Sequence, residues 1–182
     1  MQGVIFNLAE QVVTDTHGAD IWDDVLESAG LDGAYTSLGS YPDVEFAALV
    51  AATGARLGVD PLDVVRQVGE GAMPLLAQRY PDFFSAHSCT RSFLLTLNDI
   101  IHPEVRKLYP GADVPEFGFE VHGQDVLVLH YFSQRRLCAL AEGFVHGAAT
   151  LYGERVSIAQ SQSQCMLRGA DACALDCVFA AR

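Results

Sequence analysis

Three polar side chains alternate with other residues near the end of a largely apolar segment: Tyr131, Ser133 and Arg135. Alternate residues of a β-strand lie on one face, so at strand spacing this phenol, hydroxyl and guanidinium would point the same way. All three donate hydrogen bonds and no acidic residue lies among them, which suits a doubly negative ligand such as a pair of carboxylates or a phosphate. The alternative is an ordinary solvent face of an antiparallel strand.

A single histidine, His102, precedes this group in a segment rich in leucine and isoleucine. Pro103 follows it directly, which predicts a break or restart of the helix and biases His102 away from helical geometry. A neutral imidazole is a standard axial ligand of haem iron, and a Tyr/Ser/Arg clamp would suit the two haem propionates. The alternative is the usual interpretation of an isolated histidine, a satisfied or surface residue.

Four of the five cysteines fall near the end of the chain: Cys138, Cys165, Cys173 and Cys177. Four thiolates bind zinc tetrahedrally, at about 2.3 Å per bond. In a regular strand Cys173 and Cys177 would lie about 13 Å apart, so a shared ion requires the chain near 168–172 to curl. The alternative is a set of small buried apolar residues, and Cys89, outside the cluster, is expected to be a packing residue.

The elements that must position these residues follow from the periodicity of the apolar positions. Asp43 is expected to cap a helix, and Asp60 with Pro61 is expected to open the next one. The expected helices are 3–14, 21–30, 43–57, 60–80, 90–109 with its interruption at Pro103, and 136–152, and the expected strands are 117–121, 126–132, 155–162 and 173–180. This order predicts an α+β fold of one domain, with a helical lobe over about 1–62. A second lobe over about 63–182 carries a four-stranded antiparallel sheet and packing helices.

Composition limits the classes of partner. The chain has 182 residues, 50% of them hydrophobic, and a net charge of −12, which argues against nucleic acid or an anionic membrane as partner. We find no pattern of a signal peptide and no apolar run near the ~18 residues of a membrane span, so we expect a cytoplasmic protein with reduced thiols. No nucleophile–base arrangement or pair of carboxylates can be placed in one pocket, so we do not expect an enzyme.

Several motifs together resemble the haem nitric oxide/oxygen binding (H-NOX) family. They are Asn98–His102, Tyr109–Ala112, Pro115 and Tyr131-x-Ser133-x-Arg135, and the similarity extends over the chain from Met1–Asn7 through Tyr41–Asp43 to Glu142–Gly143. The resemblance is to a bacterial stand-alone member with a C-terminal cysteine cluster. It implies haem b between two lobes, His102 as the proximal iron ligand, and Tyr131, Ser133 and Arg135 as the propionate clamp.

The same resemblance assigns roles to several apolar residues. Ile5 and Pro115 match residues that press on the porphyrin, Gly71 resembles a hinge glycine, and Ala9 and Leu140 match the distal pocket. Family members that hold oxygen stably carry a tyrosine at the position of Leu140. Iron-bound oxygen gains from a hydrogen-bond donor and nitric oxide gains much less, so this chain is expected to bind nitric oxide and carbon monoxide and to exclude oxygen.

The resemblance also implies a mechanism and a partner. Nitric oxide would weaken or release the bond between iron and His102, and the signal would pass in trans to a histidine kinase or a cyclic-di-GMP enzyme. A subset of the family carries a four-cysteine zinc site near this end of the chain. The alternative function is a zinc/thiol redox sensor that uses the cysteine cluster, with or without haem.

Overall fold

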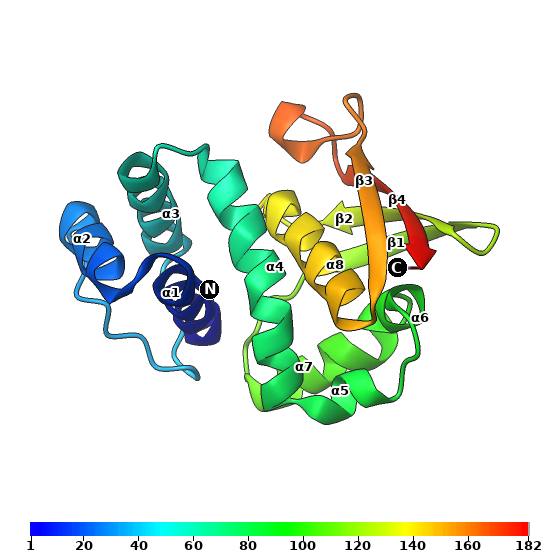
Figure 1. Ribbon diagram of the computed structural model, residues 1–182, viewed down its shortest axis with the longest axis horizontal. Helices are drawn as coiled ribbons and strands as arrows, with labels where there is room; N and C mark the ends of the chain where they lie inside the picture. Colours follow the sequence, from blue (N-terminus) through cyan, green and yellow to red (C-terminus); the bar gives the residue numbers. More distant parts are fainter. Residues whose placement is uncertain (182) are drawn as a thin grey trace.

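The computed structural model describes residues 1–181, which contain eight α-helices and one four-stranded sheet (Figure 1). The helices are α1 (Gly3–His17), α2 (Ala19–Ala29), α3 (Asp43–Leu57), α4 (Pro61–Arg79), α5 (Pro81–Ser85), α6 (Thr90–Leu94), α7 (His102–Leu108) and α8 (Cys138–Leu151). The strands are β1 (Glu116–His122), β2 (Val126–Phe132), β3 (Glu154–Gln160) and β4 (Cys173–Ala181). A π-helix, η1 (Leu97–Ile101), precedes α7, and a 3-10 turn, η2 (Met166–Arg168), precedes β4.

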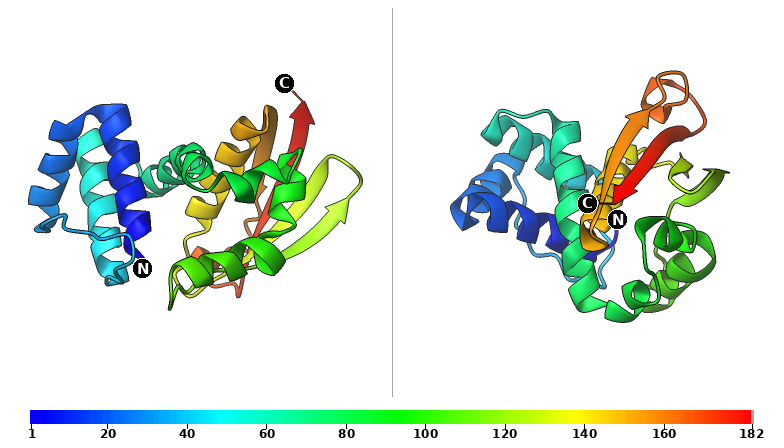
Figure 2. Two further views of the ribbon diagram at one scale, coloured as in Figure 1. Left: turned by 90° about the horizontal axis from the view of Figure 1, so that it is seen from below. Right: turned by 45° about the vertical axis from the view of Figure 1, so that its right-hand side comes forward.

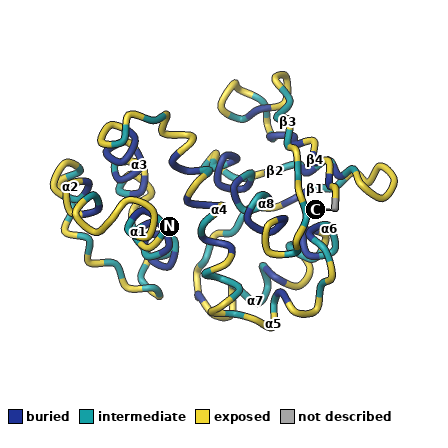
Figure 3. Tube along the Cα trace, in the orientation of Figure 1, coloured by how far each residue is buried: buried dark blue, intermediate teal, exposed yellow. Residues whose placement is uncertain are grey.

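Helices α1, α2 and α3 lie together on one side of the molecule, with α4 between them and α8 (Figures 1 and 2). Phe6, Ala9 and Val13 recur on one face of α1, and Phe46, Leu49 and Val50 do so on α3, which is the spacing of a buried helical stripe. These side chains form one core with the first half of α4. The dark blue segments of Figure 3 mark these buried faces.

Helix α4 is fixed at its start and packs closely against α8. The Asp60 side chain accepts a hydrogen bond of 2.8 Å from the backbone N–H of Leu62, and Pro61 takes the first helical position, as the sequence predicts. A Cβ added at Gly143 of α8 would come within 2.0 Å of the Arg66 carbonyl oxygen, so only glycine fits there. Close packing is also found at Gly71, where an added Cβ would come within 2.8 Å of Val12 on α1.

The sheet is antiparallel throughout, in the order β1-β2-β4-β3. Alternate residues of the two central strands point to the inner face of the sheet. There they form a second core with buried side chains of α8 and of the segments from α5 to α7. The most deeply buried of them are Leu127 and Leu129 of β2 and Leu175 and Cys177 of β4. The sheet therefore gives a rigid wall, against which the segments from α5 to α7 pack on one side (Figure 2).

The predicted α+β fold is confirmed, with the four strands and the major helices close to their expected bounds. Asp43 is not the cap of α3, because Pro42 occupies the cap position and no side-chain cap bond forms. The short helix α5 was not predicted. The proposed lobe boundary near residue 62 stays a prediction, since α4 contributes side chains to both cores. Among the described residues, no helix is long and apolar enough to cross a membrane.

Candidate functional site

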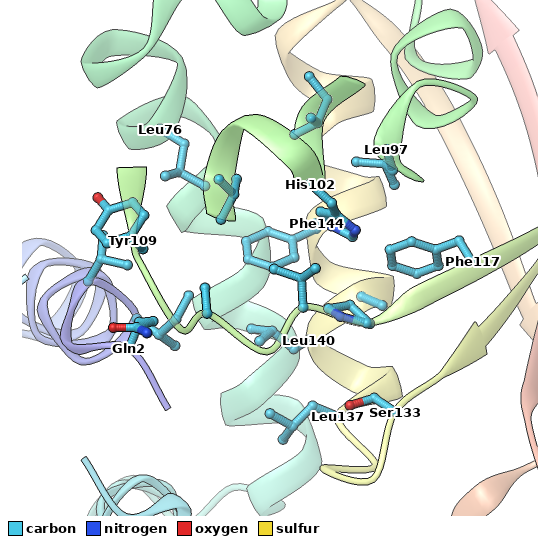
Figure 4. A pocket seen from close by; sticks show the side chains of 18 of the residues that line it. Gln2, Leu76, Leu97, His102, Tyr109, Phe117, Ser133, Leu137, Leu140 and Phe144 are labelled. Carbon is cyan, nitrogen blue, oxygen red and sulfur yellow. The ribbon is translucent and has the colours of Figure 1, made fainter. Parts of the chain in front are cut away.

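A cavity of about 280 Å³ lies between the helical side and the sheet side of the molecule. Side chains from α1, α4, α7, α8 and the first two strands line it, and most of them are apolar (Figure 4). Of the eight haem-contact residues expected from the sequence, seven line this cavity: Ile5, His102, Pro115, Tyr131, Ser133, Arg135 and Leu140. Residues far apart in the chain thus converge on one largely apolar space.

The His102 imidazole is the titratable group that the cavity changes most clearly. Burial, reinforced by the positive charge of Arg106, lowers its pKa to about 4, although the backbone carbonyl of Pro115 acts in the opposite direction. Its Nδ1 atom is buried and has no hydrogen-bond partner in the part of the chain described. The ring is therefore neutral at pH 7, the form in which a histidine nitrogen binds a metal.

The backbone at His102 differs from the sequence prediction. The residue has helical dihedral angles, φ −66° and ψ −36°, so Pro103 does not force it out of helical geometry. In a straight α-helix the Pro103 ring would clash with the carbonyl of Asp99, four residues back. The π-turn η1 inserts one extra residue before α7, with the His102 N–H donating to the carbonyl oxygen of Leu97, and this wider turn removes the clash.

The three donors of the expected clamp meet at the cavity, although not through strand geometry alone. Strand β2 ends at Phe132, so only Tyr131 lies within it, and Ser133 and Arg135 follow in a turn. Burial raises the pKa of Tyr131, so its hydroxyl keeps its proton and can still donate. The same oxygen accepts a 3.1 Å hydrogen bond from the backbone N–H of Leu137.

The Arg135 guanidinium forms ion pairs with two carboxylates. Nε lies 2.9 Å from Oδ2 of Asp43, at the start of α3, and Nη1 lies 2.8 Å from Oδ2 of Asp113. Burial opposes ionisation of Asp43, but the N-terminal amine of Met1 and Arg135 outweigh it and lower the pKa of this carboxyl. These two partners could not be predicted from the sequence, because both are distant from Arg135 in the chain. An anion that binds Arg135 must share it with Asp43 and Asp113.

The apolar wall lacks one residue expected from the sequence, Ala9, and contains two that were not expected, Leu8 and Phe144. Ala9 lies in the helical core and is not among the residues that line the cavity. Leu8 and Phe144 do line it. Helical spacing offered the signal for both, because Leu8 is one turn from Ile5 on α1 and Phe144 is one turn from Leu140 on α8.

The cysteine cluster forms a second site, separate from the cavity. The Sγ atoms of Cys138, Cys165 and Cys173 all lie within 4.8 Å of one another, and all three residues are buried. The turn η2 and Gly169, with φ +96°, provide the predicted curl and bring Cys165 back to Cys173. Cys89 lies elsewhere, at the cap of α6.

The structure leaves Cys177 outside this group of three. Strand β4 is regular from Cys173 onward, so the two residues are about 13 Å apart at ~3.3 Å per residue, and the curl lies on the wrong side of Cys173 to shorten this distance. The thiol of Cys177 instead lies 3.6 Å from the carbonyl oxygen of Leu175. The fourth of the predicted zinc ligands is therefore not assembled with the others.

Burial keeps the thiol of Cys173 protonated in the absence of a cation. Burial, opposed only by the N–H of Met166 and reinforced by Cys138 and Cys165, raises the pKa of Cys173 to about 12. The Gln160 amide lies 3.4 Å from Sγ of Cys138 and 3.2 Å from Sγ of Cys165, but it carries no charge. A bound cation would supply the positive charge that thiolates need at this place.

Comparison with known proteins identifies the relatives of this chain. A model of the haem-NO-binding family matches residues 2–160. The H-NOX protein from S. oneidensis in the Fe(II)NO ligation state has a TM-score of 0.90 and 33% identity, with 99% of each chain covered. A mutant of that protein in the Fe(II) ligation state has a TM-score of 0.91 and 33% identity, covering 99% of this chain and 96% of that one.

A more distant structure has the same fold. The unliganded Fe(II) H-NOX protein from K. algicida has a TM-score of 0.87 at 23% identity, covering 100% of this chain and 98% of that one. H-NOX domains are haem-based gas sensors, not enzymes. The cavity, with its neutral histidine and three donors, has side chains that suit a haem. The matched residues, the identity and the coverage lead to one conclusion: the chain belongs to the haem-NO-binding, or H-NOX, family.

Proposed function

We propose that the protein is a haem-based sensor that binds nitric oxide and carbon monoxide and excludes oxygen. One observation carries the proposal: a neutral imidazole at His102 and the donors Tyr131, Ser133 and Arg135 line the same apolar cavity. A neutral imidazole has the lone pair that ferrous iron requires, and the donors suit two propionates. Haem b is the cofactor that fits this set of side chains.

The side chains divide the work of holding the cofactor. A bound haem would supply the ferrous iron that binds nitric oxide, and His102 would be the protein ligand whose bond to iron is weakened. His102 would hold the iron, and Arg135 with Tyr131 and Ser133 would hold the propionates. Ile5 and Pro115, both at the cavity wall, would press on the ring and keep it from being planar.

The choice of gas is proposed to depend on the wall formed by α1 and α8. Ile5, Leu8, Leu140 and Phe144 line it and offer no hydrogen-bond donor from their side chains. Three tyrosine hydroxyls lie elsewhere on the lining: that of Tyr131 belongs to the expected propionate clamp, and those of Tyr80 and Tyr109 are hydrogen-bonded to each other. Oxygen on iron needs a donor more than nitric oxide does, so this wall favours nitric oxide.

Leu140→Tyr tests this proposal for the gas. The variant adds a hydroxyl to the wall and should raise oxygen affinity about tenfold, the effect of one hydrogen bond to a partly charged atom. Leu140→Phe is the matched control, because it adds the ring without the hydroxyl. Oxygen titration of the ferrous proteins, followed by absorption, measures the effect. Equal oxygen affinity in both variants would place control of oxygen elsewhere in the pocket.

The signal is proposed to start with the release of His102. This residue begins α7 and follows η1, so a loosened imidazole frees this helical segment to move. Ile5 belongs to α1 and lines the other side of the cavity, so α1 would also respond to a change in the bound cofactor. A switch needs a contact that differs between its two states, and the bond to His102 provides it.

The output is proposed to act in trans on a histidine kinase or a cyclic-di-GMP enzyme. Ile100, two residues before His102, is 52% exposed, so movement of the segment reaches the surface. Autophosphorylation or nucleotide turnover of a candidate partner, measured with the unliganded and the nitric oxide forms, checks this step. Equal partner activity with the two forms would contradict it.

A second candidate function is a zinc-dependent thiol redox sensor, with or without haem. It is favoured by the three buried sulfurs of Cys138, Cys165 and Cys173 within 4.8 Å. Zinc would hold them as thiolates, although burial disfavours the thiolate of Cys173 in its absence. Oxidation by hydrogen peroxide would join two sulfurs in a disulfide, release zinc, and reduce the peroxide to two waters with uptake of two protons.

Metal analysis distinguishes the two functions. Cys173→Ser should lower bound zinc at least tenfold, and peroxide should release zinc from the unchanged protein, as measured with a colorimetric zinc indicator. Cys177→Ser is the matched control, because Cys177 is equally buried but lies outside the group of three. Equal zinc loss in the two variants, or no zinc in the purified protein, would contradict this ligand set.

A further inference from the structure

The side chain of Asn98 clamps the beginning of β1. Its Nδ2 atom donates a 2.6 Å hydrogen bond to the carbonyl oxygen of Phe117, and its Oδ1 atom accepts a 3.1 Å bond from the N–H of the same residue. Strand β1 is at the edge of the sheet, so these two backbone groups point away from β2. One side-chain amide therefore satisfies both groups, as a neighbouring strand would.

The clamp connects the π-turn to the sheet. Asn98 lies inside η1, where the N–H of Ile101 donates to the carbonyl oxygen of Thr96, five residues back, at 3.1 Å. A π-turn is less favourable than an α-turn and persists only where its surroundings hold it. The Asn98 bonds fix one residue of this turn to a backbone position on a rigid strand.

Phe117 carries the effect of the clamp into the cavity. Its ring centroid lies 5.7 Å from that of His102, with 33° between the planes, and 5.9 Å from that of Tyr131. Phe117 lines the cavity, whereas Asn98 does not. Asn98 can thus influence the imidazole only indirectly, through Phe117 and through the turn that leads to His102 (Figure 4 shows both rings).

We propose that Asn98 is a positioning residue for the proximal ligand: by clamping Phe117 it holds the π-turn and fixes the direction of the His102 imidazole. The inference rests on the proposed nitric oxide sensor. With the clamp in place, the imidazole would be held at one position and could not move to keep a weakened bond to iron. Without the clamp, the segment before α7 is freer, and the imidazole follows the iron.

Asn98→Ala removes both bonds. The loss of two ordinary hydrogen bonds corresponds to roughly a thirtyfold change in a local equilibrium. We expect the backbone amides of Ile101 and His102 to exchange with solvent faster by that factor in the haem-free protein. In the haem-loaded protein, the share of the nitric oxide complex that retains the bond to His102 should rise by a similar factor, and the iron–histidine stretching frequency should increase.

Two further variants make the test specific. Asn98→Asp keeps the acceptor for the Phe117 N–H but places an oxygen against the Phe117 carbonyl in place of the donor, so its effects should have the same direction as those of Asn98→Ala. Ile100→Ala changes an exposed side chain of the same turn and should leave the stretching frequency unchanged. Asn98→Asp also preserves the test if the alanine variant does not fold.

The possible outcomes separate this inference from the proposed function. Faster amide exchange with an unchanged stretching frequency and unchanged coordination would show that Asn98 only covers a sheet edge, and would overturn the inference. Unchanged amide exchange would overturn it as well. If the wild-type haem protein gives no response to nitric oxide, the proposed function itself fails. In that case the exchange of the haem-free protein still reports on the clamp.

Discussion

The two ends of the cavity differ in charge: one carries a neutral imidazole and the other a charged guanidinium with its ion-pair partners. At one end His102 is neutral, its Nδ1 has no partner among the described residues, and its neighbours are largely apolar. At the other end Arg135 is bound between the carboxylates of Asp43 and Asp113, close to the amine of Met1. The neutral end thus has a group that can bind a metal, and the charged end has a group that can bind an anion.

The two ends also differ in how firmly their groups are committed. The His102 imidazole has a lone pair free to bind a metal. The Arg135 guanidinium already pairs with two carboxylates from different parts of the fold. Asp43 lies on the helical side and Asp113 on the loop before β1. Arg135 thus joins the two sides of the cavity, and an incoming propionate has to share it.

The largest expected effect is at the neutral end. His102→Ala removes the only side chain proposed to bind iron and should weaken haem retention more than the roughly 10–100-fold loss caused by removing an outer-shell partner. Transfer of haem to a haem-free globin measures retention. His146→Ala is the control, because His146 lies on α8 but does not line the cavity. A variant that kept a five-coordinate imidazole spectrum would show that another histidine is the ligand.

The same end should respond to acid. The pKa of His102 is about 4 in the folded chain against 6.5 in the unfolded one, so between these values only the unfolded chain binds the proton. The neutral His102 therefore contributes fully to the stability of the folded chain above pH 6.5, and this contribution is lost as the pH falls from 6.5 to 4. Allowing for solvent at the partly exposed ring, the loss is about 2 kcal/mol. Urea denaturation of the haem-free protein measures it, and His102→Ala should show a smaller loss.

Arg135 should affect retention without affecting the iron. Arg135→Ala removes the charged anchor and should speed haem loss about tenfold, while the absorption spectrum of the remaining ferrous haem stays unchanged. Arg136→Gln is the control, because Arg136 is exposed and does not line the cavity. An altered spectrum in Arg135→Ala would mean that the two ends are not independent.

The smallest effect concerns the competing carboxylate. Asp113 is 71% exposed at its side chain, so its pair with Arg135 is largely screened by solvent. Asp113→Asn should free the guanidinium for a propionate and slow haem loss about twofold at low salt, with no effect at high salt. Haem transfer rates at two ionic strengths check this. Faster haem loss in the variant would mean that Asp113 supports the anchor.

Much of this arrangement follows from local sequence signals. The apolar periodicity predicts the helices and the hairpin, and the pair Asp60-Pro61 predicts the start of α4. These features depend on neighbours within a few residues, so they can be seen in the chain itself.

The features that the sequence did not predict depend on contacts between distant segments. The π-turn has no apolar period of its own and arises from Pro103 and the surrounding packing. The carboxylates on Arg135 come from segments that only the tertiary fold brings together. Cys177 was grouped with the other cysteines by proximity in sequence, but the regular β4 separates them.

One measurement tests the central claim directly: the absorption spectrum of the reduced haem-loaded protein before and after addition of nitric oxide, with metal analysis of the same sample for iron and zinc. The account predicts a five-coordinate ferrous haem with a histidine ligand, a shifted Soret band with nitric oxide, and no stable complex in air. A protein that binds haem but shows no spectral change with nitric oxide would contradict it.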